Sequence, residues 1–106
     1  MQKAMYVVSS HPTSPEVEEE YNRWYSDVHL GDVLRVPGVV SATRYARDEN
    51  APSGAPYLAL YEFEAESIDS ILAEIKVRAG TADMVLSDAL CTEGDRKPQA
   101  LLYHLI

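Results

Sequence analysis

The sequence has one cysteine, few basic residues and no long hydrophobic run, and each shortage excludes a class of protein. Cys91 has no partner for an intrachain disulfide. Nine lysines and arginines stand against 17 acidic residues, a formal net charge of −8, so binding to a nucleic acid backbone is not expected. No window approaches the roughly 18 apolar residues of a membrane helix, and the first residues lack a signal-peptide pattern. We therefore expect a cytoplasmic protein with no nucleic acid and no membrane partner.

The hydrophobic content is ordinary for a folded protein, at 46% of 106 residues. The length predicts a single domain over residues 1–106. A globule of this size buries only roughly 65% of the surface that its unfolded chain exposes, so its own core is thin. A second copy of the chain would bury the remaining apolar surface, which predicts a homodimer.

An amphipathic helix predicted to begin near residue 15 organises the rest of the chain. Either Ser14 caps it before Pro15, or Thr13 caps it with Glu16 in a capping box. The acidic residues that follow are interpreted as a solvated first turn, which suits the positive end of the helix dipole. At about 100° per residue the pattern predicts a buried arc, with Tyr25 on its flank and His29 just beyond. That arc contains Val17, Tyr21, Trp24 and Val28.

The remaining elements complete a βαββαβ order. Gly31 is expected to interrupt the first helix, and one further turn over residues 32–36 stops before Pro37. A second helix from Ser67 to about Ala79 has a good cap at its start and Gly80 as its stop, and a short third helix is expected over residues 81–90. The four predicted strands are residues 3–10, 38–47, 57–64 and 100–106.

This order predicts the ferredoxin-like α+β fold, a four-stranded antiparallel sheet. Right-handed crossovers place both long helices on one face of the sheet. Its strands are nonetheless apolar on both faces, so the other face needs a cover. Two such sheets packed face to face would form a dimeric α+β barrel, with the homodimer held through the sheet face.

The run YNRWYSDVHLGDVLRVPGVVSATRY, residues 21–45, resembles the dimeric α/β-barrel superfamily and within it the EthD-like group. The shared features are an aromatic-rich helix, a His-Leu pair and a Val-Pro-Gly turn into a strand. YLALYEFE, residues 57–64, is similar to the third strand of that group. Gly31 departs from the proline that relatives often have there. The resemblance implies the same fold and a small-molecule pocket, and the superfamily includes cofactor-free monooxygenases, cyclases and isomerases as well as haem-dependent enzymes.

His29 is the candidate catalytic residue. It lies one turn after Tyr25 at the rim of the predicted buried face, where it could reach a cleft between helix and sheet. An unperturbed pKa of about 6.5 suits a general base at neutral pH, and the resemblance implies a histidine acting in the pocket. The alternative is that His29 caps the helix end or bonds to a loop carbonyl.

Five further residues are candidates for binding the substrate. Tyr25 and Trp24, beside Tyr21, could form an aromatic wall for a flat ligand, although aromatics at helical spacing are also typical of a plain core. Alternation along the strands cannot decide which face the other candidates occupy, and His104 could equally be an interface residue. These others are Tyr45, Tyr61 and His104, with Arg44 beside Tyr45.

No metal site and no cofactor are predicted. His29 and Asp32 stand three residues apart, but one such pair without a second histidine is weak evidence. No residue stands out as a haem ligand, and no G-x-S-x-G elbow is present. The aromatic row of the third strand invites comparison with RNA-recognition motifs, but the basic-glycine-aromatic signature is missing and the chain is acidic.

The leading hypothesis is a cofactor-free enzyme of the cyclase, isomerase, lyase or monooxygenase type. It would act on an aromatic or polyketide-like metabolite, with His29 in proton transfer and tyrosines orienting the ligand. The alternative is a non-catalytic ligand-binding or accessory homodimer that uses the same pocket. A third possibility is a structural protein whose sheet face binds a different partner.

Overall fold

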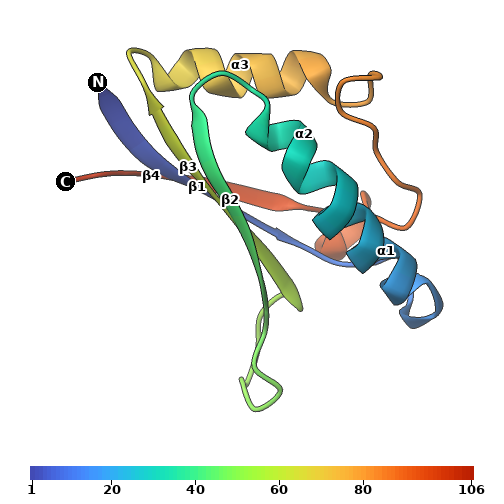
Figure 1. Ribbon diagram of the computed structural model, residues 1–106. Coiled ribbons are helices and arrows are strands. Elements are labelled where there is room, and N and C mark those ends of the chain that lie inside the picture. The colour runs from blue at the N-terminus through green and yellow to red at the C-terminus, as the bar shows by residue number, and fades with distance from the viewer.

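A computed structural model describes residues 1–106 and contains four strands and three α-helices (Figure 1). The first helical region is built of four consecutive pieces: a 3₁₀ turn at Pro15–Val17, α1 at Glu18–Trp24, a π-helical turn at Tyr25–His29, and α2 at Leu30–Leu34. A short 3₁₀ turn also lies at Gly94–Arg96. The other elements are β1 (Gln2–Ser10), β2 (Val39–Ala46), β3 (Tyr57–Ala65), α3 (Ile68–Arg78) and β4 (Gln99–His104).

The four strands form one antiparallel sheet in the order β2-β3-β1-β4. β1 and β3 are central, as the apolar character of β1 predicted. All three α-helices cover the same face, and no helix covers the other, which we call the open face (Figure 1). This arrangement is the predicted ferredoxin-like fold. No helix has the length and apolar character needed to cross a membrane.

The core lies between the sheet and the helices. Cross-strand pairing places every second residue of β1 and β3 on the helix-covered face. Ser67 caps α3, its side chain accepting a hydrogen bond from the Ser70 N–H at 3.3 Å, and Gly80 ends that helical region with a φ of +84°. The largest fully buried side chains are Tyr21, Tyr61, Phe63, Ile68, Ile71, Met84 and Val36.

The prediction that Gly31 interrupts the first helix is wrong. Gly31 lies inside α2 and is not among the glycines with positive φ. Glycine costs about 1 kcal/mol relative to alanine within a helix, and the burial of Val33 and Val36 against the sheet offsets that cost. The predicted stop before Pro37 is confirmed, because α2 is capped at Arg35.

The predicted buried arc is also wrong in part. Tyr21 and Tyr25 are the buried residues of α1 and the π-helical turn, whereas Val28 is 40% exposed. The reason is the π-helical turn, in which each hydrogen bond spans five residues instead of four. The extra residue rotates the side chains that follow it, so a wheel drawn at about 100° per residue no longer applies after Trp24.

The predicted third helix over residues 81–90 is not formed. Met84 and Ala89 are buried, but Val85 and Leu86 are about half exposed. The Thr81 hydroxyl accepts from the Asp83 N–H at 3.2 Å, and the Ser87 hydroxyl accepts from the Ala89 N–H at 3.1 Å. Such local side-chain bonds to the backbone compete with helical hydrogen bonds.

Candidate ligand site

The π-helical turn brings two aromatic rings of one helix against His29. The indole of Trp24 stacks on the imidazole, with 4.7 Å between ring centroids and 26° between planes. The ring of Tyr25 meets the imidazole edge-on at 5.0 Å. π-helical turns are rare and occur often at functional sites. We call Trp24, Tyr25, His29, Arg44 and Tyr61 the His29 cluster.

His29 is held as a neutral imidazole. Burial lowers its pKa to about 4, and the Arg44 guanidinium acts in the same direction, whereas the Asp32 carboxylate opposes them. Its Nδ1 atom is buried and has no hydrogen-bond partner. The His29 side chain forms no hydrogen bond with the chain, so the alternative that it bonds to a loop carbonyl is not what the structure shows. A neutral imidazole with a free ring nitrogen can accept or donate one proton.

Arg44 extends from β2 towards the first helical region and lies among three tyrosine rings. Its Cζ atom is 4.5 Å from the ring centroid of Tyr25, 5.1 Å from that of Tyr57 and 5.5 Å from that of Tyr21. Guanidinium groups over aromatic faces are attracted by the ring quadrupole. These contacts join the helix to the sheet at the site.

The hydrogen bonds of Arg44 all go to neutral acceptors. Nη1 donates to the Ser26 hydroxyl at 2.9 Å and to the Asn22 carbonyl at 3.4 Å, and Nη2 donates to Asn22 Oδ1 at 2.9 Å. Nε is buried without a partner. The sequence offered one signal for Arg44: it is the only charge among small residues on its strand face, between Ala42 and Ala46.

Tyr61 completes the cluster from β3. Its side chain is 1% exposed, and burial, with the neighbouring Tyr25 hydroxyl second, raises its pKa far above the usual range. Its hydroxyl has no hydrogen-bond partner. Tyr61 and Arg44 are diagonal neighbours on one sheet face, because Tyr61 pairs with Ala42.

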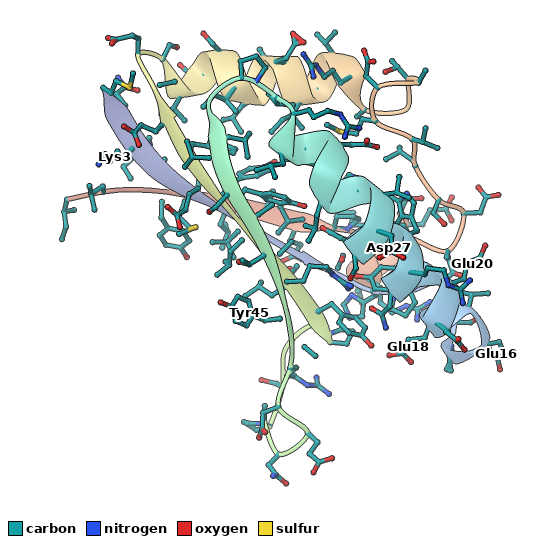
Figure 2. The ribbon with its side chains drawn as sticks, viewed as in Figure 1. Lys3, Glu16, Glu18, Glu20, Asp27 and Tyr45 are labelled. Atoms are coloured by element: carbon teal, nitrogen blue, oxygen red, sulfur yellow. The ribbon has the colours of Figure 1, made fainter.

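A polar network closes the outer end of the site. The Tyr57 hydroxyl donates to the Glu18 carboxylate and accepts from Asn22 Nδ2 at 3.0 Å. Asn22 in turn accepts from Arg44. Deeper in, the hydroxyls of Ser10 and Tyr21 share a hydrogen bond of 2.5 Å. Figure 2 shows Glu16, Glu18 and Glu20 at the outer end of the first helical region, in keeping with a solvated helix start.

The structure does not bring Tyr45 and His104 to the cluster. Tyr45 is 56% exposed on the open face, away from the helices (Figure 2). His104 is exposed near the end of edge strand β4, paired with Ala4, and lines a cavity of about 490 Å³ with Tyr103, Phe63 and residues of the C-terminus. Of the predicted site residues, His29, Tyr25, Trp24 and Tyr61 therefore lie together, and Tyr45 and His104 lie elsewhere.

No principal cavity opens onto the centre of the cluster. None of the five principal cavities is lined by His29, Tyr25 or Arg44. The histidine, cysteine and acidic side chains form no group of three or more that could hold a metal ion.

No family model matches the chain, and no curated protein matches it at a significant level. Solved structures match over nearly its whole length. An EthD family protein from Bacillus halodurans is 11% identical with a TM-score of 0.61, covering 100% of both chains. A DABB family protein with a ferredoxin-like fold from Mesorhizobium loti is 12% identical with a TM-score of 0.59, covering 100% of this chain and 99% of its own.

A third match is a dimeric ferredoxin-like protein of unknown function from a Jannaschia species. It is 18% identical with a TM-score of 0.58, and the match covers 98% of each chain. At these identities the likeness establishes the fold. The chain shares the ferredoxin-like fold of EthD family and DABB family structures, as its resemblance to the EthD-like group implied.

Proposed function

We propose that the chain binds a small, flat organic molecule at the His29 cluster and that His29 exchanges a proton with it. The observation that carries this proposal is the presence of three buried polar atoms without partners around Tyr25: His29 Nδ1, Arg44 Nε and the Tyr61 hydroxyl oxygen. The chain has only one other such side-chain atom, Nδ1 of His11, in the loop after β1.

Unpartnered buried polar atoms are costly, which is why their grouping matters. Each costs about 1–3 kcal/mol relative to a hydrogen-bonded one, and native proteins keep few of them. A ligand that offers hydrogen-bonding atoms to this cluster would recover part of that cost. The surrounding aromatic rings suit a flat ligand, since rings stack on ring faces.

The chemistry supported by the cluster is proton transfer without a cofactor. A neutral His29 can take a proton from an acidic C–H or O–H group of the ligand. The Arg44 guanidinium lies close enough to influence His29, so it would stabilise the negative charge that develops on the ligand. Isomerisation, cyclisation, a lyase step and oxygenation can all begin with such a proton removal.

Ligand access requires side chains to move, and Trp24 is the side chain that covers His29. Its indole covers one face of His29, and its Nε1 donates to the Val85 carbonyl at 2.9 Å. Val85 belongs to the segment that forms no helix. Displacement of Trp24 and this segment would open the cluster.

A non-catalytic ligand-binding protein is the second candidate, and the low pKa of His29 favours it. With a pKa of about 4, the unliganded imidazole is a weak base, so a ligand could be held by hydrogen bonds without losing a proton. The two candidates share one site and differ only in turnover.

We also propose that the protein is a homodimer through the open face. Tyr45, Leu101 and Tyr103 are each more than half exposed there, an apolar surface that a second sheet would cover. The matched Jannaschia protein is described as dimeric.

Fluorescence of Trp24 tests the proposed site, because it is the only tryptophan and stacks on His29. We expect saturable changes on titration with flat aromatic acids and ketones. His29→Ala should weaken binding, whereas Val28→Ala, an exposed position in the same π-helical turn, should not. Mass spectrometry of each incubated ligand separates an enzyme from a binder. Fluorescence that no compound changes would contradict the proposal.

A further inference from the structure

We infer that the ligand of the His29 cluster is an anion whose carboxylate or equivalent anionic oxygens pair with the guanidinium of Arg44. This inference rests on the proposed function and specifies the class of ligand. It makes Arg44, which the sequence placed beside Tyr45 without deciding its sheet face, the residue that determines ligand charge.

The first observation is that Arg44 has no counter-ion. The chain contains three side-chain ion pairs, Arg23 with Glu19, Arg35 with Asp32 and Arg78 with Glu74. Arg44 is in none of them, although acidic residues outnumber basic ones by 17 to 9. Charged groups that are taken from water are usually paired. Acidic residues are abundant in this chain, yet none of them pairs with the guanidinium that lies beneath the helix. The space beside Arg44 is therefore free of carboxylates from the chain itself.

The second observation is how the guanidinium is held. Three aromatic rings and the neutral oxygens of Asn22 and Ser26 fix its position. A guanidinium has five N–H donors, and Arg44 uses three of them, so two are left over, including that of the buried Nε. A carboxylate accepts two parallel hydrogen bonds from such a donor pair.

The third observation is the placement of Arg44 relative to the other unpartnered atoms. Tyr61 lies diagonally across from it on β3, with a free hydroxyl, and Tyr25 contacts both its guanidinium and His29. An anionic group at Arg44 would thus place the rest of the ligand beside Tyr25 and within reach of His29. The competing account is that Arg44 only ties the helix to the sheet.

Calorimetric titration with pairs of probes that match in shape and differ in charge separates these accounts. The probes are benzoate, 2-naphthoate and 9-anthroate, each compared with its neutral amide of nearly the same shape. The proteins are the native chain, Arg44→Gln, Arg44→Lys, and Arg47→Gln as the matched control. Arg47 follows the same strand, and its side chain is bonded to the Gly54 carbonyl instead of to the cluster. Circular dichroism establishes that each variant is folded.

We expect a carboxylate to bind the native protein at least about tenfold more tightly than its amide, as a charge-assisted bidentate pair implies. Arg44→Gln should reduce that preference to below about twofold, Arg44→Lys should retain part of it, and Arg47→Gln should leave it unchanged. If Arg44→Gln does not fold, Arg44→Lys, which keeps the charge but not the paired donors, decides the question: a reduced preference supports the inference, and an unchanged preference contradicts it.

Two results would overturn the inference, and they are distinguishable. If amides bind as well as carboxylates and both are lost in His29→Ala, the proposed site stands and the anionic ligand is wrong. If no probe of either kind binds, the proposed site falls, and the inference falls with it.

Discussion

Burial controls the protonation state of His29. The pKa of the imidazole is about 4 in the folded chain and about 6.5 in an unfolded one. Between these values the unfolded state binds more protons, so the free energy of unfolding rises with pH across this window and falls as the pH is lowered from 6.5 to 4. The loss of stability caused by keeping His29 neutral has its full value below pH 4 and is absent above pH 6.5.

The corresponding prediction compares the native protein with His29→Gln in urea unfolding at pH 7 and pH 4. The native protein should lose about 2–3 kcal/mol more stability than the variant over this interval, since each unit of pKa shift is worth about 1.4 kcal/mol. The carboxylates titrate in both proteins, so they cancel in the comparison. An equal loss in the two would show that His29 is not buried as a neutral base.

A second prediction at the same scale concerns Tyr61 and Tyr57. Tyr61→Phe removes a hydroxyl with no partner, so the free energy of unfolding should stay within about 0.5 kcal/mol or rise. Tyr57→Phe removes hydrogen bonds to Glu18 and Asn22 and should lower the free energy of unfolding by about 1–2 kcal/mol. Thermal or urea unfolding measures both. A large loss in Tyr61→Phe would reveal a hydrogen bond to its hydroxyl.

The feature that shapes the site at the level of elements is the π-helical turn, and the sequence did not reveal it. A helical wheel assumes the same rotation at every residue, which fails after Trp24. It therefore placed Val28 inside and Tyr25 only on the flank, whereas the structure buries Tyr25. By contrast, Ser67 and Gly80 act through local backbone geometry, so α3 was predicted almost to the residue.

Gly31→Ala tests the continuity of the helix. Gly31 has helical geometry, and an added Cβ would lie 3.7 Å from Arg35 Nη1, so alanine should raise the free energy of unfolding by about 0.5–1 kcal/mol. Gly38→Ala is the contrasting variant, with φ of +99° and a Cβ that would lie 2.6 Å from Ile71 Cδ1. It should lose about 1–3 kcal/mol. A loss of stability in Gly31→Ala would mean that the helix breaks there.

For the whole molecule, the βαββαβ order and the placement of the helices on one sheet face followed from patterns that the sequence carries. The apolar run of residues 3–10 predicted the central place of that strand. The assembly of the site did not follow, because it depends on contacts between residues far apart in the chain. Arg44 reaches Asn22 and Tyr57 only after β2 and β3 have paired beneath the helix. No local sequence pattern predicts such a contact between distant residues.

The proposed dimer makes a prediction at this scale. Sedimentation velocity should give a dimer for the native chain, and Leu101→Glu on the open face should give a monomer, because an unpaired charge in an apolar interface is costly. Val77→Glu is the matched control, since Val77 is also an exposed aliphatic residue but lies on α3. A native monomer, or equal effects of both variants, would contradict an interface on the open face.

The central claim, that a ligand binds at the His29 cluster, is tested most directly by ¹⁵N NMR of the histidine side chains during titration with 2-naphthoate and its amide. The chain has only three histidines, and His11 and His104 serve as internal references outside the cluster. The account predicts that the imidazole signals of His29 shift saturably while those of the other two stay in place. Signals of His104 that shift while those of His29 do not would place the ligand at the C-terminal cavity and contradict the account.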